Sequence, residues 1–166
     1  VGLPRARERI RSGVPPALSI RAADPADVPT VRRYIQALAA HEGRAGDADI
    51  TEAQLAEALF GQRPIVEAFV LEAEGRDVGY AIIQEQFATF HGRRKVYLED
   101  VYIDPAMRDQ GLGGEFMRWL FDLARARGCA CVDWACVENN PRAMAFYERL
   151  GASRKKGVLL YRFAVE

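Results

Sequence analysis

A glycine-rich segment at residues 108–114 carries the clearest chemical signal in the sequence. It reads Arg-Asp-Gln-Gly-Leu-Gly-Gly, follows the strand stop Asp104-Pro105 and precedes a predicted helix with an apolar face. The first turn of a helix has unpaired backbone N–H groups and a positive dipole end. Glycines let an anion approach this backbone closely, and Arg108 adds a charged contact. The segment therefore predicts a phosphate or pyrophosphate site, although an ordinary glycine-rich turn before a helix has the same composition.

Two other phosphate-binding motifs are excluded by this segment. A P-loop needs a lysine followed by serine or threonine, and no such pair occurs in the chain. A dinucleotide-binding fingerprint needs a third glycine where the chain has Phe116. A different type of loop must therefore hold the anion.

Two adjacent carboxylates, Glu99 and Asp100, interrupt an apolar strand just before this segment. Because neighbouring residues of a strand face opposite sides of a sheet, at least one carboxylate is expected to point into the interior or a cleft. An unpaired buried carboxylate costs on the order of several kcal/mol. The pair therefore indicates a functional site or a buried ion pair, and Asp100 in particular could pair with an arginine.

The elements that position these residues follow from hydrophobic spacing and from helix-capping residues. Asp24 is the predicted N-cap of a first helix that ends near His41, and Thr51 with Gln54 forms a capping box for a second. A third helix follows the glycine segment and ends at Gly128, and a fourth begins at Asn140. Strands are predicted at 18–21, 66–71, 78–84, 95–103, 131–135 and 158–165, with a turn at Glu74, Gly75 and Arg76 between the second and the third. This order predicts a mixed α/β (α+β) fold, with an antiparallel meander followed by a strand–helix–strand unit.

Length and charge limit the possible partners. The 166 residues suit one domain, which is expected to span 18–166. Residues 1–17 carry four arginines and three prolines, and indicate a flexible extension or an arm on a partner subunit. Basic and acidic residues both number 23, so neither nucleic acid nor an anionic membrane is an expected partner. No apolar run approaches the length that spans a bilayer.

Three cysteines, Cys129, Cys131 and Cys136, lie close together in the sequence. The two histidines are distant from them, so the spacing of a zinc site is absent and no metal is expected. Three is an odd number for a disulfide framework. Buried thiols in a reducing cytoplasm are therefore the expectation.

The glycine segment has the form R-x-x-G-x-G-G and resembles the acetyl-CoA signature of the Gcn5-related N-acetyltransferases (GNAT). The likeness covers most of residues 18–166 and is greatest toward the diamine (spermidine/spermine) and thialysine N-acetyltransferases. It rests also on IRAADPAD from Ile20, His41-Glu42, TEAQLAEALFGQRP from Thr51, YLEDVYI from Tyr97 and NPRAMAFYERLGA from Asn140. The resemblance implies a GNAT fold, with a mixed, mostly antiparallel central sheet flanked by about four helices. It also implies direct acetyl transfer from acetyl-CoA to a primary amine, and a homodimer.

The resemblance implies roles for individual residues as well. Glu99 would position or deprotonate the amine, and Tyr147 would protonate the departing thiolate. By its spacing alone, Tyr147 would be read as a core aromatic of its helix. The acceptor would be bound by His41, Glu42, Glu99 and Asp100, with histidine at position 41 where the family usually has tyrosine. The residues implied for acetyl-CoA are Val101, Tyr102, Ile103, Arg108, Asp109, Gln110, Gly111, Leu112, Gly113, Gly114, Asn140, Pro141, Arg142, Ala143 and Tyr147.

The acceptor remains open between several classes. The carboxylates favour a small cationic amine, namely a polyamine, a diamine or a thialysine-like amine. One alternative is acetylation of a protein or peptide amine, which needs an open groove rather than an acidic pocket. Another is an acyl-CoA-binding sensor without catalysis, which would need neither Glu99 nor Tyr147.

Overall fold

The computed structural model describes residues 17–165, so the predicted extension at 1–17 lies almost wholly outside the described residues. The chain forms two compact units, of which the first ends at Asp133 and the second begins at Trp134. Within the described residues, no helix is both long and apolar enough to span a bilayer.

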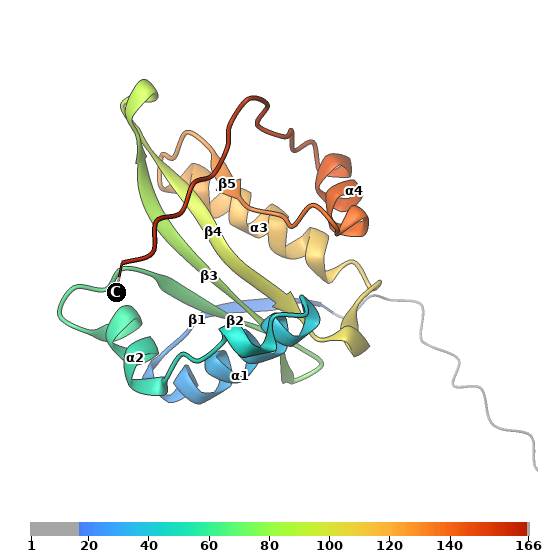
Figure 1. Ribbon diagram of the computed structural model, residues 1–166. Coiled ribbons are helices and arrows are strands. Elements are labelled where there is room, and N and C mark those ends of the chain that lie inside the picture. Colours follow the sequence, from blue (N-terminus) through green and yellow to red (C-terminus); the bar gives the residue numbers. More distant parts are fainter. Residues whose placement is uncertain (1–16, 166) are drawn as a thin grey trace, which may run out of the picture. The chain divides into compact units, whose positions relative to one another are not determined.

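The strands form one five-stranded sheet in the order β1-β2-β3-β4-β5 (Figure 1). Their bounds are β1 Ser19–Ala22, β2 Glu67–Ala73, β3 Arg76–Ala88, β4 Arg93–Ile103 and β5 Val132–Trp134. β1 pairs antiparallel with β2, β2 with β3 and β3 with β4. The predicted turn between β2 and β3 is confirmed, because Glu74 and Gly75 have the positive φ angles (53° and 74°) of a tight hairpin.

Helices cover both faces of this sheet. They are α1 Val28–His41, α2 Glu52–Phe60 and α3 Leu112–Ala126, all in the first unit. The second unit holds α4 Pro141–Arg149, and single 3-10 turns lie at Pro25–Asp27, Ala45–Asp47, Thr89–His91 and Pro105–Met107. α1 and α2 lie on one face, where Val31 and Leu55 share a core with Tyr80 of β3 (Figure 1). α3 lies on the other face, where the Trp119 ring is centred 4.8 Å from that of Phe69. The expected α/β fold, with a mixed sheet and four helices, is confirmed.

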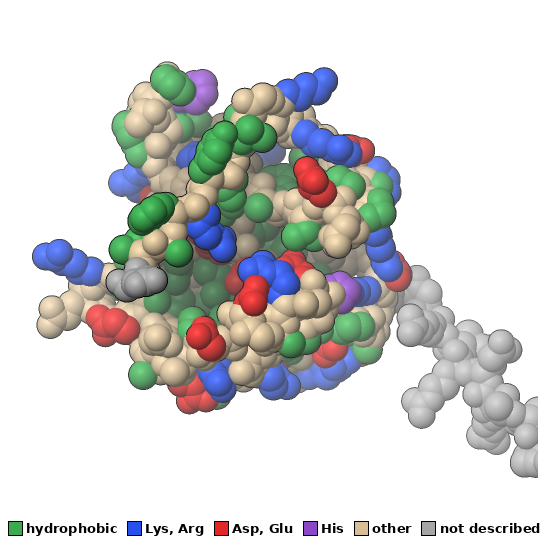
Figure 2. Space-filling model, in the orientation of Figure 1, with side chains coloured by type: hydrophobic (Ala, Val, Ile, Leu, Met, Phe, Trp, Pro, Cys, Tyr) green, Lys and Arg blue, Asp and Glu red, His purple; other side chains and the backbone are tan. Residues whose placement is uncertain are grey.

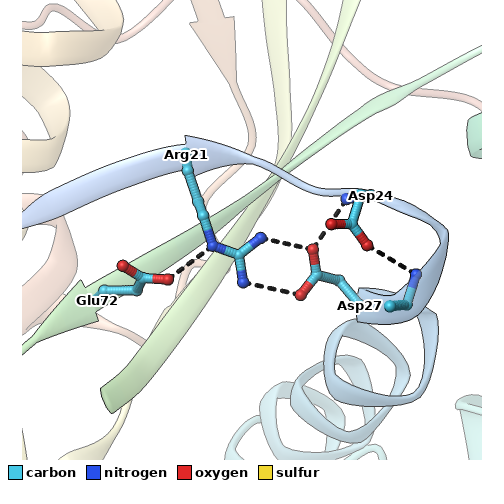
Figure 3. A network of polar contacts seen from close by, with 5 residues as sticks. Arg21, Asp24, Asp27 and Glu72 are labelled. Atoms are coloured by element: carbon cyan, nitrogen blue, oxygen red, sulfur yellow. Dashed lines mark hydrogen bonds and ion pairs between the residues drawn. The ribbon is translucent and has the colours of Figure 1, made fainter. Parts of the chain in front are cut away.

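A partly buried ion-pair network fixes the start of α1 (Figure 3). Asp24 caps the turn by accepting from the Ala26 N–H at 2.7 Å, and its own N–H donates to Asp27 at 2.8 Å. Arg21 of β1 donates to both oxygens of Asp27, at 2.6 and 2.8 Å, and through Nε to Glu72 of β2 at 2.6 Å. The network therefore ties β1, β2 and the start of α1 together. The sequence predicts the Asp24 cap but not the Arg21 pairing.

Loss of Asp27 is expected to destabilise the fold by about 2 kcal/mol, because Arg21 and the capping N–H would lose their acceptor. Urea unfolding of Asp27→Ala measures this, with Asp24→Ala as a milder control at about 1 kcal/mol. Arg21 holds the pKa of Asp27 below its usual range. Asp27 therefore contributes stability above the ordinary carboxyl pKa and loses it as pH falls through the lowered value, so the deficit should shrink in acid. Equal stability of the Asp27→Ala and wild-type proteins at neutral pH would contradict this role.

The predicted strand at 158–165 is wrong. The structure has no strand there, and the apolar side chains of this segment are exposed (Figure 2). They belong to Val158, Leu159, Leu160, Tyr161, Phe163 and Val165. The segment is apolar except for Arg162, which suits a buried strand, but a ladder also needs a neighbouring backbone that composition does not supply.

The three cysteines differ in exposure. Cys129 is buried as expected, whereas Cys131 and Cys136 are exposed, so the prediction is wrong for these two. β5 is shorter than predicted, which leaves Cys131 outside the strand, and Cys136 lies beyond even the predicted end at 135. Burial raises the pKa of the Cys129 thiol. In residues 17–165 no group of three His, Cys, Asp or Glu side chains is placed to hold a metal ion.

Candidate functional site

A β-bulge in β4 places the two carboxylates side by side. Ile82 of β3 pairs with Asp100, and the next residue, Ile83, pairs with Leu98. Glu99 is therefore an extra residue without a partner in this ladder. The bulge interrupts the alternation from which Glu99 and Asp100 were expected to face opposite sides.

Both carboxylates contact side chains on one face of β3. The Gln84 side-chain amide donates to Glu99 Oε1, and the Tyr80 hydroxyl donates to Asp100 Oδ2 at 3.1 Å. Tyr80 and Gln84 are four residues apart in a strand, so their side chains share a face. Because Tyr80 belongs to the core beneath α1 and α2, the two carboxylates lie on the α1/α2 side of the sheet. The expectation that adjacent carboxylates would point to opposite sides is therefore wrong.

The pKa values of both carboxylates are raised. For Asp100 the main cause is burial; the hydrogen bond from Tyr80 lowers the pKa, and the charge of Glu42 raises it further. For Glu99 the main cause is again loss of hydration; the hydrogen bond from Gln84 lowers the pKa and the charge of Asp100 raises it. A carboxylate with a raised pKa that is still ionised at neutral pH is a better proton acceptor than an ordinary one. Glu99 and Asp100 therefore have the properties of an acid–base or cation-binding pair rather than of a salt bridge.

The end of α1 approaches the same carboxylates. His41 is its last residue and Glu42 its C-cap. The charge of Glu42 contributes to the raised pKa of both Asp100 and Tyr80, so it is within electrostatic reach of them. Arg44 Nη1 lies 3.9 Å from Glu42 Oε2, and Figure 2 shows acidic and basic side chains together on the surface. A glutamate at a helix C-terminus is unfavourable for the helix dipole, which fits a binding role better than a stabilising one.

Arg108 links the glycine segment to the end of α1. Its Nε donates to the Ile103 carbonyl at 2.9 Å, and its Nη1 lies 3.1 Å from His41 Nε2. Because arginine only donates, the His41 Nε2 must accept in this contact. The guanidinium also lies over the Tyr102 ring, 5.4 Å from its centre. The sequence did not predict the Arg108–His41 contact. It joins the loop predicted to bind acetyl-CoA to a residue predicted to bind the amine substrate.

The glycine segment curls before α3 begins at Leu112. Asp109 and Gly111 both have left-handed backbone, with φ of 62° and 86°. Gly111, the N-cap of α3, takes this conformation without strain because it lacks a Cβ. At Gly114 an added Cβ would meet the protein only at the Arg118 side chain, 3.5 Å away, which is an ordinary contact. Packing within the described protein thus does not require glycine at 114, whereas close approach of a ligand would.

Gly79 is a residue that the sequence analysis missed. It pairs with Ile103, and a Cβ added to it would lie 2.1 Å from the Tyr102 carbonyl oxygen. Only glycine therefore lets β3 approach the end of β4 that carries Val101 to Ile103. A lone glycine inside an apolar strand is the sequence signal that could have found it.

In the second unit, α4 carries the remaining predicted residues. Asn140 caps α4 by accepting from the Ala143 N–H at 3.0 Å, and Pro141 occupies the first turn. Tyr147 is half-buried, with its ring centred 5.0 Å from Trp134 and 5.3 Å from Phe146. The predicted start of this helix is confirmed, and Tyr147 lies in an aromatic cluster of the same unit.

Comparison with known proteins identifies the family. A family model described as "Acetyltransferase (GNAT) family" matches residues 33–152, well over half of the chain. The chain belongs to the GNAT family. Thialysine N-epsilon-acetyltransferase of Bos taurus is 33% identical over 141 residues, which cover 80% of this chain and 82% of that protein. Spermidine/spermine N(1)-acetyltransferase-like protein 1 of Homo sapiens is 29% identical over 154 residues, covering 87% of this chain but 22% of that protein.

Solved structures agree with the fold of this GNAT protein. A possible acetyltransferase from Clostridium difficile 630 superposes with a TM-score of 0.78 at 18% identity, covering 90% of this chain and 98% of that one. The GNAT protein is thus an acetyl-CoA-dependent N-acetyltransferase by family and by its relatives. In its first unit the β4 bulge, the end of α1 and the glycine segment come together through the Tyr80–Asp100 and His41–Arg108 contacts. Residues 140–147 lie in the second unit.

Proposed function

We propose that this enzyme transfers the acetyl group of acetyl-CoA directly to a primary amine of a small cationic acceptor, such as a polyamine, a diamine or a thialysine-like amine. The β4 bulge carries this proposal, because it brings Glu99 and Asp100 to one face, and Asp100 is within electrostatic reach of Glu42. Several carboxylates at one place suit an acceptor that bears more than one positive charge. The relatives named for thialysine and for spermidine/spermine support the same class of acceptor.

We propose that the donor is held by backbone at the end of β4 and at the start of α3. In support, Gly111 supplies a left-handed turn, and Gly114 leaves room that the protein itself does not fill. The backbone N–H groups of this curled segment suit the pyrophosphate, and Val101 to Ile103 would bind the pantetheine arm. Asn140 to Ala143 of the second unit would close around the donor. This assignment follows the family signature at residues 108–114.

In the proposed chemistry, Glu99 takes a proton from the ammonium group of the acceptor, directly or through water, and so produces the neutral nucleophile. The amine nitrogen attacks the thioester carbonyl carbon, and the tetrahedral intermediate expels the thiolate as the C–S bond breaks. Tyr147 protonates the thiolate. The nitrogen loses its second proton to solvent, and a proton from solvent restores the Tyr147 hydroxyl. Each turnover yields an N-acetylated amine, CoA with a free thiol and one proton released to water.

Arg108→Ala is expected to raise the KM for acetyl-CoA about tenfold, because a positive charge beside the proposed pyrophosphate site is lost. Arg108→Lys should restore only part of this loss, since an ammonium group cannot reproduce the planar fork that bonds Ile103 and contacts His41. The KM is measured at saturating diamine. Arg125→Ala, at the exposed far end of α3, serves as the control. An unchanged KM for acetyl-CoA in Arg108→Ala would remove this side chain from the donor site.

An acetylation assay over a panel of acceptors tests the proposed function. Release of CoA thiol is followed with diamines, polyamines, thialysine and lysine, and in parallel with peptides that offer an N-terminal or a lysine amine. Turnover confined to the small cationic amines is the expected result. Faster turnover of the peptides would favour a protein acetyltransferase, and tight acetyl-CoA binding without thiol release on any acceptor would favour a sensor.

We further propose that residues 18–166 act as one acetyltransferase domain, because the family match at 33–152 draws on both compact units. A homodimer and a cytoplasmic location stay predictions from the family resemblance and the cysteine content.

A further inference from the structure

Tyr80 is a buried residue that neither the family signature nor the acetyl-transfer chemistry above uses. Its side chain is 0% exposed in the centre of β3. Its hydroxyl nevertheless donates to Asp100 Oδ2 at 3.1 Å, across the ladder that joins β3 to β4. A buried phenol needs a hydrogen-bond partner, and here the partner is one of the proposed acceptor carboxylates.

Three groups from three elements act on the Asp100 carboxylate. They are Tyr80 on β3, Glu42 at the end of α1 and Glu99, the neighbouring residue of β4. Glu42 and Glu99 are acidic and disfavour a second negative charge. Across residues 17–165, Tyr80 is the single hydrogen-bond donor to Asp100. The ionised form of Asp100 therefore depends on this hydroxyl.

The position of the Tyr80 hydroxyl is fixed by its neighbours. Its ring stacks on Tyr34 of α1 with 6.1 Å between centres and 4° between planes, and the Tyr34 ring also contacts Tyr102. Burial and the charge of Asp100 raise the pKa of Tyr80 far above the neutral range, so the hydroxyl keeps its proton and stays a donor. A fixed donor on Oδ2 leaves Oδ1 of Asp100 able to accept from another group.

We propose that Tyr80 is a positioning residue for the acceptor amine, whose hydroxyl holds the Asp100 carboxylate ionised and oriented so that Oδ1 receives a positively charged nitrogen of the acceptor. This proposal rests on the proposed function, because it requires Asp100 to bind a cationic acceptor. The proposal gives β3 a part in binding the acceptor. The family resemblance implies acceptor residues only at the end of α1 and on β4. Without the hydroxyl, Asp100 would be held among acidic neighbours and would take up a proton more readily.

Tyr80→Phe removes only the hydroxyl and is the informative variant. The KM for a diamine should rise about tenfold, since a hydrogen bond to a charged group is lost, while the KM for acetyl-CoA stays the same. The acid limb of kcat/KM for the diamine should move upward by about one pH unit, because the pKa of Asp100 rises once its donor is gone. A tyrosine that only fills the core would change the melting temperature without moving either quantity.

Tyr34→Phe is the matched control. Tyr34 lies in the same aromatic stack, and its hydroxyl has no hydrogen bond among residues 17–165. Its loss should leave the diamine KM and the acid limb as in the wild-type enzyme. Equal effects of the Tyr34 and Tyr80 variants would overturn the proposal.

Asp100→Asn, alone and combined with Tyr80→Phe, separates the positioning role of Tyr80 from the binding of the acceptor by Asp100. Asp100→Asn should raise the diamine KM at least as much as Tyr80→Phe, and the double variant should add nothing further. If Asp100→Asn raises the KM but Tyr80→Phe does not, the positioning role fails and the proposed function stands. If Asp100→Asn leaves the KM unchanged, Asp100 does not bind the acceptor, and that part of the proposed function fails with it.

Discussion

Glu99→Gln is expected to lower kcat/KM for a diamine about 100-fold, because the proposed proton acceptor is lost while the shape of the side chain is kept. Acetyl-CoA should bind nearly as before, because Glu99 contacts Gln84 on the α1/α2 side of the sheet and not the glycine segment. Steady-state kinetics with each substrate varied in turn separate the two effects. Glu74→Gln, in the exposed turn between β2 and β3, is a control that removes a carboxylate elsewhere. Wild-type kcat/KM in Glu99→Gln would exclude Glu99 from the mechanism.

The pH dependence gives an independent check on Glu99. Only the ionised carboxylate can accept a proton, so kcat/KM should fall as pH drops through the pKa of Glu99. Loss of hydration raises that pKa, with the charge of Asp100 acting in the same direction and the Gln84 hydrogen bond opposing it. The acid limb should therefore lie above the ordinary glutamate value, and in Glu99→Gln it should keep only the contribution of Asp100. Gln84→Ala should move the limb further upward, because it removes the contact that lowers the pKa.

Tyr147→Phe is expected to reduce kcat at least about tenfold, because the proposed proton donor to the thiolate is removed. The loss should be largest at high pH, where solvent is least able to supply the proton in its place. Kinetics across pH measure this, with Tyr161→Phe as a control because Tyr161 is 86% exposed on the C-terminal segment. The substitution keeps the ring that packs against Trp134 and Phe146, so the fold of α4 should be retained. A kcat equal to wild type at every pH would reject the acid role of Tyr147.

Local features of the fold could be predicted because they depend on short stretches of sequence. The Asp24 and Thr51 caps, the Glu74-Gly75 turn and the glycine segment before α3 each rest on one or two residues with a strong backbone preference. The order of strands and helices follows from the same capping and turn residues. These features are confirmed with shifts of a few residues at the ends, except that the last predicted strand is absent.

The geometry of the candidate site could not be predicted, because it depends on register between strands. The alternation rule places Glu99 and Asp100 on opposite faces, whereas the bulge opposite Ile82 and Ile83 brings both to the same one. No local residue pattern predicts a bulge at this position. The Arg108–His41 and Tyr80–Asp100 contacts join residues far apart in sequence and were likewise missed.

At residues 158–165 the sequence predicts a strand that the structure does not have. All residues at 158–165 except Arg162 are apolar, as in a buried strand, yet the structure gives this segment no ladder. Side-chain pattern and backbone pairing are separate requirements, and a sequence displays only the first. For the same reason the helix and strand types were easier to predict than the contacts between them.

The most direct test of a cationic acceptor compares two amines that differ in one charge. 1,4-Diaminobutane and 1-aminopentane offer the same reacting amine and nearly the same length, but only the first carries a second ammonium group. If Glu42, Glu99 and Asp100 receive that group, kcat/KM should favour the diamine at least about tenfold, and the preference should fall in Asp100→Asn. Equal kcat/KM for the two amines in the wild-type enzyme would contradict the account.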